Sequence, residues 1–326
     1  MNVLIILSLV SASLSSAAEE TADLNAGGSV GTLRILNKLG TGRNSIVYRA
    51  VGDWAKLAVK TAMVPNEQLA REAEVLTALN TTTGFPRIYA WNTDEKYIVM
   101  ELLDGFTSLD KYTNPADIPL PVEQIAISLL DRLESVHAAG FVHVDIHKRN
   151  ILVDGETGEV DLIDFGLAVK ITEHKSPLFV NLYLSSTVEQ ARSPLYPVDD
   201  IERLMFVLLD CFYHPLPWIS MMRMRESLDK KLREGPEVLA LATALEELIW
   251  ANKSELHANE EFFSSRNFHP GFRRVLEYIK TTAEMRRSES FPIDYNLLRS
   301  YFRDPADLLT DALTESLSQV KFDPSL

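Results

Sequence analysis

The chain has 326 residues, of which 46% are hydrophobic and 24% are charged, and these proportions are typical of a globular protein. They exclude a wholly disordered, collagen-like or coiled-coil chain, and the length predicts about two lobes or domains. The formal charge of −14 argues against a broad nucleic-acid or anionic-membrane surface, because such surfaces are basic. Cys211 is the single cysteine, so the core must be stable without an internal disulfide.

The N-terminal sequence predicts a secretory signal peptide over residues 1–18, followed by a flexible leader over 19–31. Val3–Val10 is an apolar run interrupted by one serine, and small residues follow it. The run is too short to span a bilayer, which needs about 20 apolar residues, and no later stretch is long enough. We therefore expect a secreted protein without a membrane span. The alternative is a buried first element of a cytosolic protein.

Two sequons, at Asn80 and Asn252, fit a secretory route, although such triplets are common by chance.

After the leader, hydrophobic patterning predicts a five-strand antiparallel sheet with one helix. The helix is expected over Asn66–Asn80, where the apolar residues recur at helical spacing. The expected strands are Thr32–Leu39, Ser45–Val51, Trp54–Thr61, Arg87–Trp91 and Tyr97–Leu102.

Beyond Asp104-Gly105 the pattern becomes helical. The expected helices are Pro121–Ala139, Ile201–Tyr213, Glu237–Ala251, Phe272–Arg287, Tyr295–Phe302 and Pro305–Ser318. The chain therefore predicts an α+β fold. Its β-rich lobe covers residues 32–103, its α-helical lobe covers 104–303, and a helical tail covers 304–326.

A first group of residues suited to phosphate chemistry lies in the β-rich part. Gly40-Thr41-Gly42 separates two expected strands, and glycines there let backbone amides approach phosphates closely. Lys60 ends the apolar run Ala58-Val59-Lys60. A lysine in such a strand must pair with a counter-charge, because an unpaired buried ammonium carries a heavy desolvation penalty. Glu72 on the expected helix offers a partner, and a lysine–glutamate pair suits phosphoryl transfer. Taken singly, a hairpin glycine, a snorkelling lysine and a solvated glutamate explain these residues equally well.

A second group follows in the helical part. Asp145 and Asn150 lie five residues apart in one expected loop, where they can serve a substrate hydroxyl and a metal ion. Asp164 ends an apolar strand and can bind Mg²⁺ that bridges phosphate oxygens. Any one of these pieces could arise by chance, but all of them in this order are hard to obtain by accident.

These motifs resemble the signature set of eukaryotic protein kinases. The resemblance rests on the glycine loop, Ala58-Val59-Lys60, Glu72, His143-x-Asp145 with Asn150, and Asp164-Phe165-Gly166. It covers about Leu33 to Phe302 and implies a bilobal protein-kinase-like fold. The segments that resemble the casein kinase 1 group are Val99–Leu103, Ile163–Ala168, Asp199–Glu202 with Leu216–Trp218, and Pro292–Arg303.

The resemblance implies a role for each matching residue. Asp145 would orient or deprotonate the acceptor hydroxyl, and Lys60 would hold the α- and β-phosphates and pair with Glu72. Asn150 and Asp164 would bind Mg²⁺. The residues implied to bind ATP are Leu39, Gly40, Gly42, Val47, Ala58, Lys60, Met100, Glu101, Leu103 and Leu152. The implied reaction is ATP- and Mg²⁺-dependent phosphorylation of Ser or Thr in a protein substrate, with no nucleic-acid partner.

Three residues depart from the kinase pattern. Ser45 replaces the third loop glycine, Val144 replaces an arginine that contacts a phosphate on the activation segment, and His147 replaces a lysine that neutralises charge on the transferred phosphoryl group. Val144 predicts activity that does not depend on phosphorylation of that segment. The loop pattern His-x-Asp-x-His-x-x-Asn also resembles aminoglycoside and choline phosphotransferases. A small-molecule kinase and a pseudokinase that serves as a nucleotide-binding scaffold therefore remain as alternatives.

Overall fold

The computed structural model describes residues 29–30, 33–42, 45–52, 56–62, 67–92, 96–176, 181–213, 215–229, 231, 235–282 and 292–303. The expected signal peptide, most of the expected leader and the expected C-terminal tail lie outside these residues. The chain divides into two compact units, and each is described by itself. The first comprises Met1–Thr113 with Arg132–Lys175, and the second comprises Asn114–Asp131 with Ser176–Leu326.

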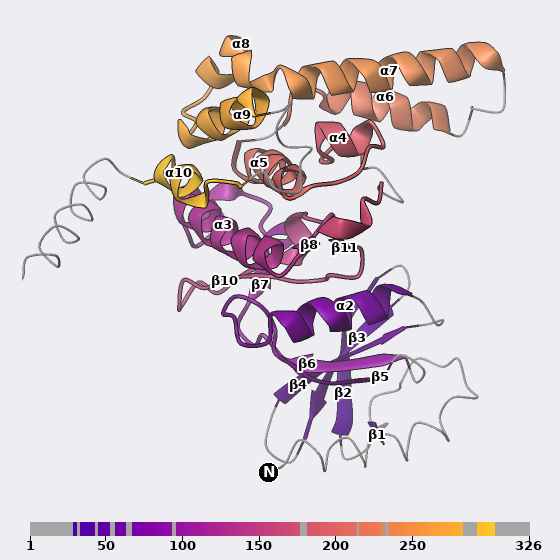
Figure 1. Ribbon diagram of the computed structural model, residues 1–326, viewed down its shortest axis with the longest axis vertical. Helices are drawn as coiled ribbons and strands as arrows, with labels where there is room; N and C mark the ends of the chain where they lie inside the picture. Colours follow the sequence, from indigo (N-terminus) through magenta and orange to yellow (C-terminus); the bar gives the residue numbers. More distant parts are fainter. Residues whose placement is uncertain are drawn as a thin grey trace, which may run out of the picture. The chain divides into compact units, whose positions relative to one another are not determined.

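The first unit is built on an antiparallel sheet with strand order β1-β2-β3-β4-β6-β5 (Figure 1). The strands are β1 (Ser29–Val30), β2 (Leu33–Thr41), β3 (Ser45–Val51), β4 (Lys56–Ala62), β5 (Ile88–Asn92) and β6 (Tyr97–Glu101). The five expected strands are confirmed as β2 to β6. The two-residue strand β1 was not expected, because it falls in the stretch interpreted as a leader.

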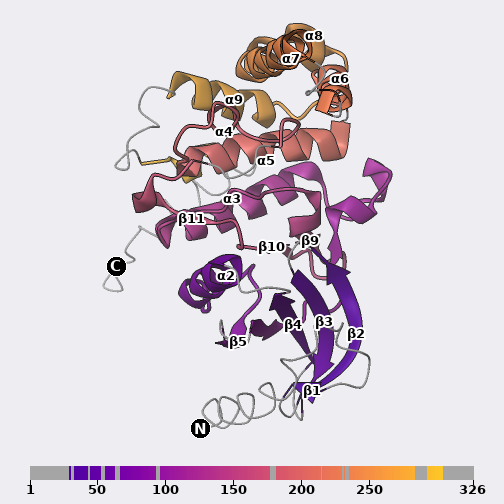
Figure 2. The ribbon, with the colours of Figure 1, turned by 90° about the vertical axis from the view of Figure 1, so that its right-hand side faces the viewer.

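One helix, α2 (Glu67–Ala78), lies against β5 (Figure 2) and also packs on β6. It confirms the helix expected over 66–80. Its buried residues recur at helical spacing and are Leu69, Glu72, Ala73, Val75 and Leu76. Glu72 is the one charged residue on this buried face, so its carboxylate requires a partner inside the unit.

Short strands complete the first unit and frame two loops. β7 (Thr107–Ser108), β9 (Ile151–Val153) and β10 (Val160–Leu162) form one small sheet, and β8 (Phe141–Val142) pairs with β11 (Val169–Lys170). The loop from His143 to Asn150 runs from β8 to β9, and the loop from Ile163 to Ala168 runs from β10 to β11. These two antiparallel ladders therefore fix the ends of the loops that carry the second group of candidate residues.

The second unit is helical. Its helix α3 (Val122–Ala138) begins in this unit and ends in the first. The other helices are α4 (Thr187–Gln190), α5 (Pro197–Tyr213), α6 (Ile219–Asp229), α7 (Pro236–Ser254), α8 (Glu260–Ser264), α9 (Gly271–Thr281) and α10 (Tyr295–Ser300). Helices were expected at α3, α5, α7, α9 and α10, whereas α4, α6 and α8 were not; the helix expected over 305–318 lies outside the described residues.

Helix α5 is the centre of the second unit and is buried along almost its whole length. Its Phe206 ring meets the buried Trp218 ring edge-on, with the ring centroids 5.1 Å apart. Among the described helices, none has both the length and the apolar character that crossing a bilayer requires.

Candidate active site

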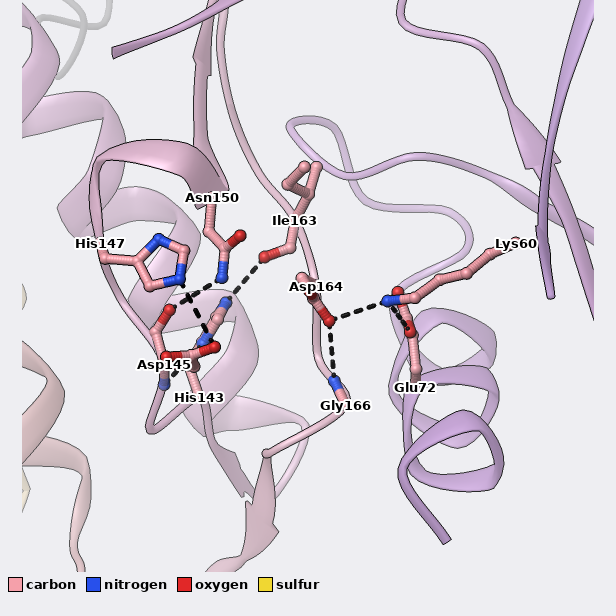
Figure 3. A network of polar contacts seen from close by, with 9 residues as sticks. All are labelled: Lys60, Glu72, His143, Asp145, His147, Asn150, Ile163, Asp164 and Gly166. Carbon is pink, nitrogen blue, oxygen red and sulfur yellow. Dashed lines mark hydrogen bonds and ion pairs between the residues drawn. The ribbon is translucent and has the colours of Figure 1, made fainter. Parts of the chain in front are cut away.

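Lys60 on β4 lies between two carboxylates of the first unit. Its Nζ is 2.6 Å from Oε2 of Glu72 on α2 and 2.9 Å from Oδ1 of Asp164 in the loop after β10 (Figure 3). The side chains of Lys60 and Glu72 are 9% and 4% exposed, whereas that of Asp164 is 44% exposed. The structure therefore brings together three of the predicted residues, although Lys60 and Asp164 are 104 positions apart in the sequence.

Burial and charge act in opposite directions on these three groups. Burial alone would lower the pKa of Lys60, but the fields of Glu72 and Asp164 outweigh it and raise that pKa. Burial raises the pKa of Glu72 to about 7, against the opposing effect of Lys60. Burial also acts to raise the pKa of Asp164. The charge of Lys60 and the hydrogen bonds that Asp164 accepts outweigh burial, so the pKa of Asp164 is lowered. Lys60 stays cationic and Asp164 stays anionic at neutral pH, so the exposed carboxylate is ready to bind a cation.

The loop from β8 to β9 is fixed by hydrogen bonds around Asp145 (Figure 3). The Asp145 amide donates to Nδ1 of His143 at 3.2 Å, so the ring proton of neutral His143 is on Nε2, which lies 3.2 Å from the Ile163 carbonyl. The Asn150 side-chain amide donates to the Asp145 carbonyl at 2.9 Å. This use of the amide nitrogen leaves the amide oxygen of Asn150 as the atom that can bind a metal.

Two residues of these loops have left-handed backbone. Val144 has a φ of +70° and Asp164 a φ of +66°. A β-branched residue is rarely found there, and such conformations cost on the order of 1–3 kcal/mol each. Val144 is also largely buried. The surrounding hydrogen bonds therefore stabilise a strained backbone directly before Asp145.

The side chain of His147 lies beside the carboxylate of Asp145. The sequence did not predict this contact between the two side chains. Nε2 of His147 is 3.6 Å from Oδ2 of Asp145, and its Nδ1 is buried without a hydrogen-bond partner among the described residues. Burial lowers the pKa of His147, and the neighbouring Asp145 only partly offsets this. His147 is therefore a neutral side chain at pH 7 next to the proposed catalytic carboxylate.

The residues implied to bind ATP lie in the same unit. In the sheet, Val47 on β3 is paired with Gly40 on β2 and with Lys60 on β4, and Ala58 is paired with Met100 on β6. The remaining positions are Leu39 and Gly42 in and after β2, Glu101 at the end of β6, Leu103 just beyond it, and Leu152 on β9.

Backbone groups near the end of β6 differ in their availability. The Glu101 amide donates to the Arg87 carbonyl at 2.8 Å. In the described part of the chain, neither the amide nor the carbonyl of Leu103 has a hydrogen-bond partner. Leu103 therefore offers one donor and one acceptor that an adenine edge could use. The amide of Glu101 is not available as a donor, because it already donates to Arg87.

Comparison with models of known protein families finds a match that covers the site. Residues 33–191 fit the family model of the protein kinase domain, a range that contains the cluster around Lys60 and the loop around Asp145. The expected fold class, with a β-sheet N-lobe and a helical C-lobe, is confirmed. This part of the chain therefore resembles a protein kinase domain.

Proposed function

We propose that this chain is an ATP- and Mg²⁺-dependent protein kinase that phosphorylates Ser or Thr hydroxyls, similar to the casein kinase 1 group. The cluster of Lys60, Glu72 and Asp164 is the observation that carries the proposal. It presents one buried cation and one exposed carboxylate within the residues that match the protein kinase domain.

The nucleotide would be held by charge and by backbone. Lys60, kept in place by Glu72, is the group that would donate to the α- and β-phosphates. Gly40 has open space where a Cβ would stand, so a phosphate could approach the β2 backbone there. The amide and carbonyl of Leu103, which have no partner among the described residues, would bind the adenine edge.

The donor set fits a magnesium ion that arrives with the nucleotide. Asp164 offers a carboxylate and Asn150 an amide oxygen, and both are hard oxygen ligands of the kind Mg²⁺ prefers. The described residues contain no group of three or more His, Cys, Asp or Glu that could hold a metal on their own. Held by Asp164 and Asn150, Mg²⁺ would neutralise phosphate charge when the nucleotide is bound.

The proposed transfer requires one proton acceptor. The substrate hydroxyl oxygen forms a bond to the γ-phosphorus as the bond from that phosphorus to the ADP oxygen breaks. The hydroxyl proton passes to the carboxylate of Asp145, whose backbone is fixed by His143 and Asn150. Lys60 and Asp164 position the phosphates and do not exchange protons in this step.

The test uses the purified full-length chain with labelled ATP and Mg²⁺. Acceptors are a protein and peptide panel, and separately a panel of aminoglycosides and choline, with Asp164→Ala as the inactive control. Label transferred to Ser or Thr of peptides supports the proposal. Transfer to the small molecules only, or nucleotide binding with no transfer to any acceptor, overturns it in favour of a small-molecule kinase or a pseudokinase.

Replacement of His147 by lysine is expected to give phosphoryl transfer at least as fast as the wild type at pH 7.5. Neutral His147 cannot compensate the charge that develops on the phosphoryl group, whereas lysine is charged at that pH. Because burial lowers the pKa of His147, the wild type gains this charge only below the usual value near 6.5, and the advantage of the variant should shrink from pH 7.5 to pH 5.5. A large loss of kcat in the variant at pH 7.5 would show that histidine itself is required.

Activity is expected to be independent of phosphorylation after Asp164-Phe165-Gly166. Ser185, Ser186 and Thr187 are buried, so their hydroxyls are inaccessible to a modifying kinase. The exposed hydroxyls of the segment before them belong to Thr172 and Ser176. The double variant Thr172→Ala/Ser176→Ala should keep kcat within about twofold of the wild type, since surface changes of this kind are close to neutral. A phosphatase-sensitive wild type or an inactive double variant would contradict this expectation.

We also propose that the protein enters the secretory route, a proposal supported by the sequence of residues 1–18. N-terminal sequencing of protein from the culture medium should find Ala18 or Glu19 as the first residue. Retention of Met1 on protein found only in the cytosol would contradict it.

A further inference from the structure

Two ion pairs join α2 to the segment that follows Asp164-Phe165-Gly166. Nη2 of Arg71 lies 2.8 Å and 3.1 Å from the two carboxylate oxygens of Glu173. Nζ of Lys170 lies 2.6 Å from Oε1 of Glu74, and Arg71 also contacts Glu74 at 2.9 Å. The four residues form one network of alternating charge, and all of them belong to the first unit.

The Arg71–Glu173 pair differs from an ordinary surface pair in its burial. The side chains of Arg71 and Glu173 are 17% and 25% exposed, whereas that of Lys175, a second partner of Glu173, is 56% exposed. Partial burial reduces screening by solvent and salt. The hydrogen bond from Arg71, opposed in part by burial, lowers the pKa of Glu173, so its carboxylate is charged at neutral pH.

Arg71 is the neighbour of Glu72 on one rigid helix. Holding Arg71 at Glu173 therefore limits how far α2 can rotate or move, and with it how far Glu72 can move from Lys60. Gly166 also lies near α2 one turn earlier, since a Cβ built on it would be 3.4 Å from Cβ of Gln68. The segment after Asp164 thus passes close to α2 at Gln68 and forms ion pairs with it at Arg71 and Glu74.

We propose that Glu173 is a positioning residue, which acts through Arg71 to hold α2 where Glu72 reaches Lys60. The carboxylate is a permanent charge, so this arrangement needs no covalent modification. The effect on catalysis rests on the proposed kinase function, whereas the effect on α2 does not. Loss of the pair should raise the fraction of molecules in which α2 has moved and the Lys60–Glu72 pair is broken.

The test compares Glu173→Gln, Arg71→Gln and the double variant with the wild type. Hydrogen exchange of the amides in α2 is measured first, since it needs no activity. Glu173→Gln should speed that exchange about tenfold, as expected when a local opening equilibrium shifts. The kcat should fall about tenfold while the KM for ATP changes less than about threefold, because fewer molecules are competent at any moment. The double variant should be no worse than either single one.

The matched control is Glu255→Gln, which removes the exposed Lys280–Glu255 pair of 2.8 Å in the second unit. It should leave exchange in α2 at the wild-type rate. If Glu173→Gln likewise leaves exchange in α2 unchanged, or if the effects of the two single variants simply add, the positioning role is wrong. A wild type without transfer activity would refute the proposed function, while the exchange rates would still decide whether Glu173 holds α2.

Discussion

Replacement of Asp145 by asparagine is expected to lower kcat by about 10²- to 10⁴-fold, the usual contribution of a positioned general base. Asparagine keeps the size of the side chain but cannot accept the hydroxyl proton. The backbone contacts of this residue, from its amide to His143 and from Asn150 to its carbonyl, are retained. The affinity for the Mg²⁺–ATP complex should therefore stay close to that of the wild type, and isothermal titration beside steady-state kinetics measures both quantities.

Two variants make this result specific. Asp117→Asn is the same chemical change at an exposed aspartate of the second unit and should leave kcat unchanged. Asp164→Asn should instead weaken binding of the Mg²⁺–ATP complex, because Asp164 is the proposed metal ligand and the partner of Lys60. If Asp145→Asn retains wild-type kcat, or loses nucleotide affinity as severely as Asp164→Asn, the assignment of Asp145 as proton acceptor is wrong.

Much of the fold could be predicted because the longer elements repeat their pattern several times. Strands β2 to β6 have five or more residues each, enough for their apolar and β-branched runs to be visible, and the apolar spacing of α2 extends over three turns. The elements that were missed are short or lack a clear stripe. Strand β1 has two residues, and β8 and β11 also have two each, so their conformation depends on pairing with distant partners.

A residue of the candidate site could be predicted only where its type is unusual for its position in the sequence, such as a charged residue in an apolar strand. Lys60 stands out because an ammonium group in an apolar strand must find a counter-charge, and Glu72 on the expected helix can supply it. Arg71 and Glu173 are ordinary charged residues 102 positions apart, and nothing in their own neighbourhoods distinguishes them from a solvated surface. The contact of His147 with Asp145 and the left-handed backbone of Val144 likewise depend on how the loop closes.

Replacement of Lys60 by methionine is expected to reduce the free energy of unfolding by about 3–5 kcal/mol at pH 8.5, as well as to abolish transfer. Removing one partner of a buried ion pair leaves the other charge uncompensated, and the side chain of Glu72 is only 4% exposed. The neighbouring Asp164 adds repulsion once Lys60 is absent. Urea unfolding followed by tryptophan fluorescence measures the loss.

The pH dependence identifies Glu72 as the cause of that loss. Burial raises the pKa of Glu72 to about 7 in the wild type, although Lys60 opposes the rise. Without Lys60 the folded-state pKa rises further. A carboxyl group whose pKa is raised by folding loses stability as the pH increases from its unfolded value to its folded value. The wild type and Lys60→Met therefore lose stability in parallel up to about pH 7. Above that pH only Lys60→Met continues to lose stability.

The deficit of Lys60→Met should accordingly be smaller at pH 6 than at pH 8.5. The double variant Lys60→Met/Glu72→Leu should recover most of the stability at both values, because two apolar side chains replace a buried ion pair that had to be desolvated. The double variant should nevertheless remain inactive, since no cation is left to bind the phosphates. An equal deficit at pH 6 and pH 8.5, or no recovery in the double variant, would mean that Lys60 stabilises the fold by packing and not through the charge of Glu72.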